Sequence, residues 1–398
     1  MRRVAYVVLP VALATGLMVW HFLPRLAALA LIVRVAKQEG PWARLARLAA
    51  AKVHEGPIFS ISTRHGPMEA RLYRPEKPAR RTTILVPGVH MDGINEERLV
   101  GLARELAASG MQVLTVAPPD LARYRITPDS TDMLEDAVAW ASARADLAPD
   151  GRVGLMGISF SGGLALVAAG RPAVRDRIAF VLSFGGHDDL GRVLRYLCQG
   201  STDALPSATE ARVLATGGAN ITIPKPHDYG GVVTLLNLAE RAVPNSQVAP
   251  LQQAITVFLQ ASSIDRLDPA KSEAVFARAR HLGDALPDPA RTLMTYVNQR
   301  NVEKLGETIA PWLATIELPP ALSPARSPAP TAPVFLLHGA DDSVVPASET
   351  LFLARRLRQT TRVRALASRL ITHAEVNRSA AIAEIWRLSD FWQDLMAR

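Results

Sequence analysis

Cysteine is almost absent from this sequence, since 398 residues include only Cys198. A single cysteine excludes an internal disulfide framework and offers no thiolate cluster for a metal ion. The chain is long enough for one large or two ordinary domains, and a hydrophobic content of 48% is ample for a buried core. The composition therefore predicts a folded protein that is not held together by disulfides or a metal cluster.

Acidic residues are scarce at the N-terminus, where residues 1–52 carry eight basic side chains and one acidic side chain, Glu39. This segment accounts for +7 of the net charge of +8. The basic excess thus belongs to the N-terminus and not to a groove on the folded domain, so we expect no nucleic-acid partner.

Charge is absent from the seventeen residues between Val4 and Trp20. A helix of that length nearly crosses the hydrocarbon core of a bilayer. We favour a single uncleaved anchor in a membrane of the bacterial inner-membrane type, with the side of the membrane left open. The alternative is a secretory signal peptide beginning at Arg2 and Arg3, but its small-residue site Ala12-Leu13-Ala14 lies inside the apolar run.

The segment 41–53 is a candidate for a short basic helix that contains Trp42. Arginine, lysine and tryptophan suit the headgroup layer of a membrane. A solvated linker helix is the other interpretation, and the sequence does not decide between the two.

Strands and helices are expected to alternate after His54. The segments Ile58–Thr63 and Met68–Arg74 predict a hairpin that turns at His65-Gly66. Further strands are expected at 82–86, 111–116, 152–158, 177–183, 334–337 and 362–370. Helices are expected at 96–109, 129–147, 347–359 and 380–396. This alternation predicts an α/β fold with a mostly parallel, doubly wound sheet.

The alternation stops between His187 and Thr331, which predicts an inserted helical cap. Its expected helices are 228–243, 250–267, 271–286 and 291–307. The proline-rich stretch 318–333 is typical of a stiff extended linker. The predicted organisation is a membrane segment with a basic linker (1–53), a first core part (54–186), the cap (187–331) and a second core part (332–398).

A short apolar strand runs into an apolar helix through Gly157-Ile158-Ser159-Phe160-Ser161. Such a bend brings the serine hydroxyl to its tip, and the residues two before and two after must be small because the backbone folds back on itself. The pattern indicates a nucleophile elbow at Ser159. The usual final glycine is replaced by Ser161, whose Cβ predicts slight strain in the bend.

Two further groups suit the chemistry of an activated serine. Asp341 and Asp342 follow one expected strand, and His373 follows the next. All of them lie at the edge of the sheet where the elbow lies. A histidine takes the serine proton and returns it to the leaving group, while a carboxylate fixes the tautomer of the imidazole. An aspartate that caps the next helix and an ordinary loop histidine are the plain alternatives.

A competing position for the acid is Asp188 or Asp189, after the strand that follows the elbow helix. His338-Gly339 is interpreted as turn chemistry and not as a catalytic base.

About half of the chain resembles the α/β-hydrolase fold family. The matching motifs are Pro87-Gly88-Val89, the elbow at Ser159, the segment from His338 to Pro346, and Thr372-His373-Ala374-Glu375. The resemblance implies that Asp342 is the acid of a triad Ser159, Asp342, His373. It also implies an oxyanion hole formed by the backbone N–H groups of Val89 and Phe160.

These observations predict a membrane-anchored serine hydrolase that cleaves carboxyl esters with apolar groups, without metal or cofactor. Peptidase, lipase and acyltransferase activities stay open, because one fold hosts many chemistries. A non-catalytic hydrolase-like protein that binds a ligand or partner is a second class, favoured by Ser161. A membrane scaffold is a third class. The substrate itself and the oligomeric state are not predicted.

Overall fold

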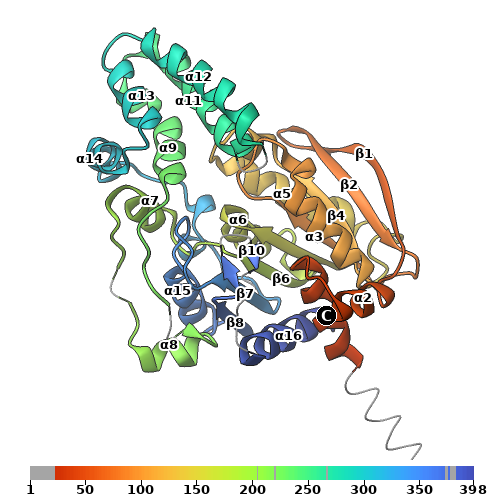
Figure 1. Cartoon of the computed structure of the whole chain (residues 1–398). Helices are drawn as coiled ribbons and strands as arrows, with labels where there is room; N and C mark the ends of the chain where they lie inside the picture. The colour runs from red at the N-terminus through yellow and green to blue at the C-terminus, as the bar shows by residue number, and fades with distance from the viewer. Residues whose placement is uncertain (1–22, 204, 219–220, 266–267, 373–374, 377–381) are drawn as a thin grey trace, which may run out of the picture.

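A computed structural model describes residues 23–203, 205–218, 221–265, 268–372, 375–376 and 382–398. Its centre is an eight-stranded sheet of order β1-β2-β4-β3-β5-β6-β7-β8 (Figure 1). The strands are β1 (Val53–Thr63), β2 (Gly66–Pro75), β3 (Thr82–Val86), β4 (Gln112–Ala117), β5 (Val153–Ile158), β6 (Ile178–Phe184), β7 (Val334–Gly339) and β8 (Val363–Ser368). Strand β2 is antiparallel to both neighbours, and all other pairs are parallel.

Helices cover both faces of this sheet, because its central strands are apolar on both sides. Leu155 of β5 belongs to the apolar cluster on one face, and its neighbour Met156 belongs to the cluster on the other. The core helices are α3 (Glu97–Ala108), α4 (Pro119–Ala122), α5 (Pro128–Ser142), α6 (Phe160–Gly170), α15 (Ser348–Leu357) and α16 (Ile382–Met396). The predicted fold class, a mostly parallel doubly wound sheet of the α/β-hydrolase type with an inserted helical cap, is confirmed.

The cap consists of helices that lie between β6 and β7 in the chain, and in Figure 1 they occupy the top and the left side of the molecule. They are α7 (Leu190–Gln199), α8 (Ala208–Leu214), α9 (Asp228–Asn237), α10 (Ala239–Ala242), α11 (Asn245–Asp265), α12 (Pro269–Asp284), α13 (Ala290–Asn298) and α14 (Val302–Leu313). Two cap segments that were each predicted to form one helix form two helices instead. The helix expected at 228–243 breaks at Leu238, and the one expected at 291–307 breaks at Arg300, whose φ is +52°.

The proline-rich segment 318–333 is not a free extended linker, so that prediction was wrong. It forms the short 3₁₀ turns η4 (Pro320–Leu322) and η5 (Pro324–Arg326), and Leu322 and Pro324 are buried. A Cβ at Gly170 of α6 would lie 1.8 Å from the Pro328 carbonyl oxygen. The segment 318–333 thus packs against the elbow helix α6, and its prolines restrict the backbone in that packed conformation. We call this segment the strap.

The N-terminal part that the structure describes packs on the body. Residues 23–35 are helical, and Ala28, Leu31 and Ile32 join the apolar cluster that contains α3 and α16. A boundary between residues 53 and 54 therefore cuts through packed structure. The expected membrane segment Val4–Trp20 lies outside the described residues, and among the described helices none is both long and apolar enough to span a bilayer.

Candidate active site

Ser159 occupies the bend between β5 and α6 with a left-handed backbone, φ +55° and ψ −132°. A non-glycine residue in this region costs about 1–3 kcal/mol and persists only where its surroundings enforce it. Here the Ser159 N–H donates to the Phe184 carbonyl oxygen at 2.6 Å, which ties the bend to the end of β6. The strand-bend-helix geometry is that of a nucleophile elbow.

Gly157 is the small residue that this bend requires. A Cβ on Gly157 would lie 2.1 Å from the Ser161 carbonyl oxygen and 2.7 Å from the Gly162 nitrogen, both backbone atoms that cannot move without opening the turn. The tight approach explains why the sequence has glycine two residues before Ser159.

Gly157→Ala should therefore open the elbow, destabilising the protein by several kcal/mol, about the cost of the larger packing errors. Its matched control is Gly101→Ala on α3, where a Cβ meets nothing within 4 Å. That change should raise stability by about 0.5–1 kcal/mol through helix propensity. Thermal unfolding of both variants checks the prediction, and equal melting temperatures would contradict it.

Ser161 is accommodated without the strain that the sequence suggested. Its side chain is fully buried in α6, and its hydroxyl donates to the Pro87 carbonyl oxygen at 2.5 Å. Pro87 begins the loop after β3 that continues through Gly88 and Val89. The serine that departs from the usual motif thus ties this loop to the elbow helix, a contact that a glycine could not make.

The loop after β3 lies directly beside the candidate nucleophile. A Cβ on Gly88 would lie 3.2 Å from Ser159 Cβ and 3.8 Å from Ser159 Oγ. The next carbonyl, that of Val89, accepts a hydrogen bond from the Tyr229 hydroxyl of cap helix α9 at 3.0 Å. The cap is thereby joined to the loop that holds one of the two expected oxyanion donors.

Asp342 follows β7 and is buried near Ser159, with an exposed fraction of 3%. Its Oδ1 accepts the N–H groups of Val344 and Val345 at 2.8 and 3.0 Å. A Cβ on Gly185 would lie 3.6 Å from Asp342 Oδ2 and 3.9 Å from Ser159 Cα, so this glycine separates the two residues. The carboxylate is oriented by the backbone, with Oδ2 on the side of the elbow.

The alternative acids are engaged elsewhere. Asp341 accepts from the Thr222 hydroxyl at 2.9 Å in an exposed position. Asp189 caps α7 by accepting from the Arg192 N–H at 2.8 Å. Asp188 accepts from Arg356 Nη2 at 2.8 Å and lies 3.3 Å from Arg192 Nη2. Of the four aspartates, Asp342 is thus the one whose carboxylate approaches the elbow.

Asp188 belongs to a buried ion cluster that holds the loop after β6. Glu349 of α15 accepts from Arg192 Nε at 2.5 Å and from the N–H groups of Asp188 and Asp189. Burial lowers the pKa of Arg192, but the hydrogen bond and charge of Glu349 outweigh burial and raise it above its usual value. The cluster joins α7 of the cap to α15 of the core, and no local sequence pattern indicates it because its members are far apart in the chain.

His187 packs against Phe160, the residue that follows Ser159 in the elbow. Its ring stacks on Phe160 with centroids 4.9 Å apart, and Nε2 lies 2.8 Å from the Leu322 carbonyl oxygen. The side chain is fully buried, and burial lowers the pKa of His187 so that the ring stays neutral near pH 7. This ring fixes the side chain of Phe160, whose backbone N–H is the other expected oxyanion donor.

His338 was wrongly interpreted as turn chemistry. It lies in β7, is fully buried, and bonds to Thr350 Oγ1 through Nδ1 at 2.7 Å and to the Val345 carbonyl through Nε2 at 2.9 Å. Both ring nitrogens are therefore engaged in holding the loop that carries Asp342.

His373 lies outside the described residues. The residues that flank this position form the short antiparallel pair β9 (Ile371–Thr372) and β10 (Glu375–Val376). Strand β9 follows β8, which pairs in parallel with β7. The chain therefore reaches this pair from the sheet edge that carries Ser159 and Asp342.

The apolar residues of the cap pack mainly against one another. Val232 and Leu236 of α9 and Ile255 and Phe258 of α11 are at most 2% exposed and share one cluster. Half-buried Val89 and Met91 of the loop after β3 pack against that cluster. The cap interior is thus filled by its own side chains, and the loop beside Ser159 contributes the half-buried apolar residues Val89 and Met91.

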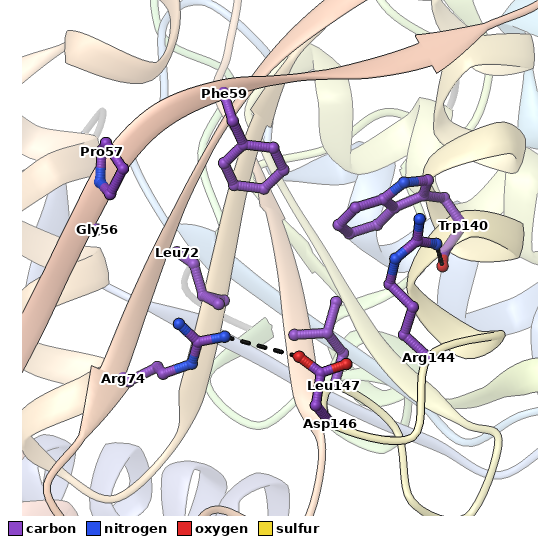
Figure 2. A pocket seen from close by; sticks show the side chains of 9 residues that line it. All are labelled: Gly56, Pro57, Phe59, Leu72, Arg74, Trp140, Arg144, Asp146 and Leu147. Carbon is purple, nitrogen blue, oxygen red and sulfur yellow. Dashed lines mark hydrogen bonds and ion pairs between the residues drawn. The ribbon is translucent and has the colours of Figure 1, made fainter.

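A pocket of about 300 Å³ lies elsewhere, between the β1–β2 hairpin and the end of α5 (Figure 2). Phe59 and Trp140 face one another in it, with ring centroids 5.8 Å apart. Its two arginines are already engaged, Arg144 over the Trp140 ring at 3.8 Å and Arg74 with Asp146 at 3.7 Å. The pocket is lined by none of the candidate catalytic residues.

No protein-family model matches the sequence, and no curated protein matches it. Several solved structures are similar in fold. An esterase from the archaeon Pyrobaculum calidifontis is 15% identical, with a TM-score of 0.41 over 89% of this chain and 88% of that one. Brefeldin A esterase, a bacterial homologue of human hormone-sensitive lipase, is 13% identical, with a TM-score of 0.40 over 94% and 84%.

An acylaminoacyl peptidase from Pyrococcus horikoshii is 12% identical, with a TM-score of 0.42, and the match covers 90% of this chain but 43% of the peptidase. At these identities and TM-scores the similarity assigns no role to any residue of this chain. The order of the strands in its own sheet, with β2 antiparallel and the others parallel, is the evidence that this chain has the α/β-hydrolase fold.

Proposed function

We propose that this protein is a serine hydrolase that cleaves carboxyl esters through an acyl-enzyme on Ser159. The observation that carries the proposal is the left-handed backbone of Ser159 at the bend between β5 and α6. The bond from the Ser159 N–H to Phe184 holds this strained conformation, and Gly157 leaves the room that the bend needs; such strain is concentrated at active sites. Its chemical consequence is an accessible hydroxyl at the N-terminus of a helix.

In this proposal Ser159 Oγ attacks the ester carbonyl while His373 accepts the hydroxyl proton. The bond from Oγ to the acyl carbon forms, the bond from that carbon to the alcohol oxygen breaks, and His373 returns the proton to the departing alcohol. Water then repeats the sequence on the acyl-enzyme and releases the acid. Asp342 holds the imidazole in the required tautomer and stabilises its positive charge.

The negative charge on the tetrahedral intermediate would be stabilised by the N–H groups of Val89 and Phe160. Two contacts support this assignment, since Gly88 lies beside Ser159 and the Ser161 hydroxyl ties Pro87 to α6. Donors held rigidly by the fold need no reorganisation during the reaction.

A fluorophosphonate probe tests the proposal on the full chain, because it reacts covalently with an activated serine. We expect one label, on the peptide that contains Ser159. A protein that only binds a ligand or a partner would carry no label, and that result would end the proposal. The feature that favoured such a protein, Ser161, is accounted for by its bond to Pro87.

We further propose an uncharged ester with an apolar acyl or alcohol part as the substrate. The support is the loop beside Ser159, whose Val89 and Met91 are apolar and half-buried. Each methylene that enters an apolar pocket contributes about 0.8 kcal/mol, or about fourfold in kcat/KM, until the pocket is full.

Nitrophenyl esters of increasing acyl length check this substrate class. We expect kcat/KM to rise from the acetate to medium chains. Activity confined to the acetate, or to peptide or charged substrates, would contradict it and would favour the peptidase alternative. Transfer of the acyl group to an added alcohol at the expense of hydrolysis would favour an acyltransferase.

We infer that residues 1–22 anchor the protein in a membrane, on the support of the uncharged run Val4–Trp20. The full chain should sediment with membranes and resist extraction by high salt, because ions do not screen hydrophobic burial. A chain that begins at Leu23 keeps the packed helix 23–35 and should lose the salt-resistant fraction. Recovery of a shortened mature chain from the soluble fraction would instead indicate a cleaved signal peptide.

A further inference from the structure

Helix α2 (Pro41–Leu48) packs on the protein with its small residues and turns its large apolar residues outward. Ala43 and Ala46 are 2% and 5% exposed, whereas Trp42, Leu45 and Leu48 are 76%, 56% and 82% exposed. A surface helix of a globular protein normally places its large apolar residues against the core. This inversion means that the apolar face of α2 is available for something other than the body of the protein.

The exposed face of α2 is held rigidly. Arg34, whose side chain is 5% exposed, donates to the Ala46 carbonyl oxygen at 2.9 Å and to Glu105 Oε2 at 2.5 Å. The turn after the helix is fixed where the Ala51 N–H donates to the Ala108 carbonyl oxygen at 2.8 Å. The outward direction of Trp42, Leu45 and Leu48 is therefore set by contacts with Arg34 and with α3.

Exposed large apolar side chains are concentrated near α2. Nine large apolar side chains are exposed among the described residues, and five of them lie between Leu23 and Leu48. A sixth, Trp386, lies under the guanidinium of Arg25 at 5.1 Å, and it belongs to α16, which lies at the same end of the molecule as α2 (Figure 1). The cap helices α11 to α13 lie at the opposite end in that view.

The positive charge of α2 favours an anionic binding partner. Arg44 and Arg47 are exposed beside the apolar face, and no ion pair within the described part of the chain includes either of them. A second copy of the chain would bring like charges together, whereas an anionic lipid surface neutralises them. A short amphipathic helix with tryptophan, leucine and arginine at its surface is typical of a helix that lies in the headgroup layer.

We propose that α2 docks into the headgroup layer of an anionic bilayer, with Trp42, Leu45 and Leu48 buried at the acyl boundary. Residues 1–22 are not required for this contact, and neither is hydrolysis at Ser159. Docking fixes the end of the body that carries α2 and α16 against the lipid, so that the cap points away from the membrane.

A fluorescent probe on Leu45→Cys in the full chain tests the docking. The native Cys198 is buried, and burial raises its pKa to about 12, so its thiol should label poorly. With vesicles that contain phosphatidylglycerol, we expect a blue shift of an environment-sensitive dye and quenching by lipids with brominated acyl chains. The control is the same dye on Glu273→Cys of α12, which should stay in water although the chain is bound.

The basic flank is tested by Arg44→Gln together with Arg47→Gln. Each basic residue near an anionic surface is worth about 1 kcal/mol, so the ratio of docked to undocked α2 should fall about 30-fold. Removing the same charge from α12 with Lys271→Gln and Arg278→Gln should leave this ratio unchanged.

Three results would overturn the proposal. One is a Leu45→Cys dye that stays in water while the chain is bound to the vesicles. Another is an equal blue shift at Glu273→Cys. The third is a blue shift of the Leu45→Cys dye without lipid that grows with protein concentration, because that would identify a second copy as the partner of α2.

Discussion

Ser159→Ala should remove ester hydrolysis and fluorophosphonate labelling together. Loss of a nucleophile that acts within a triad lowers kcat by about 10⁶-fold, which leaves only the contribution of substrate binding and oxyanion stabilisation. The fold should survive the change, because φ of +55° at this position is enforced by Gly157 and by the bond from the Ser159 N–H to Phe184 and not by the hydroxyl. Alanine is strained there much as serine is.

Ser161→Ala is the matched control, since it removes a hydroxyl two residues away in the same bend. The change leaves the Pro87 carbonyl oxygen without its bond from Ser161, so stability should fall by about 1–3 kcal/mol. Labelling at Ser159 should persist. If the label instead moves to residue 161 in the Ser159→Ala protein, or is lost only in Ser161→Ala, the nucleophile is assigned to the wrong serine.

Much of the core could be predicted from the sequence because its signals are local. The run Thr82–Val86 is entirely buried and was predicted with the bounds of β3, since it is short, rich in β-branched residues and followed by Pro87-Gly88, which together favour a buried strand. The hairpin is likewise set by turn chemistry: its turn residues are Arg64 and His65, one position before the prediction, and Gly66 follows with φ of +105°. Both features depend only on residues that are close in the chain.

Features that depend on distant contacts could not be predicted. The break at Arg300 requires a left-handed arginine, which no sequence pattern announces. The strap at 318–333 resembles a linker in composition, yet it packs because the Leu322 carbonyl meets His187 and the Pro328 carbonyl meets Gly170. In each case tertiary contacts override what proline content and helix propensity suggest.

In the candidate site, too, the features with local sequence signals were predictable and those that depend on distant contacts were not. The elbow was predictable because Gly157 and Ser159 are two residues apart. The role of Ser161 was not, because its partner Pro87 belongs to a loop 74 residues earlier in the chain. The resemblance to the α/β-hydrolase fold favoured Asp342 as the acid, with Asp188 as a competing position, and no local sequence pattern indicates that Asp188 is bonded to Arg356.

Asp342→Asn should lower kcat by about 10⁴-fold with little change in stability. An amide in place of the carboxylate donates to the imidazole where the carboxylate accepts, so it holds His373 in the tautomer that cannot take the Ser159 proton. Asparagine keeps the Oδ1 oxygen that accepts from Val344 and Val345, so the loop should remain folded. The readouts are kcat for a nitrophenyl ester and the melting temperature.

Asp188→Asn should give the opposite pattern, because Asp188 is bonded to Arg356 and faces Arg192. Removing one partner of a buried charge cluster costs about 3–5 kcal/mol, and the partial exposure of Arg356 places this change near the lower figure. We therefore expect a large fall in melting temperature with kcat retained in the folded fraction. If Asp188→Asn abolishes turnover at unchanged stability while Asp342→Asn stays active, the acid of the triad follows β6 and the assignment to the strand β7 is wrong.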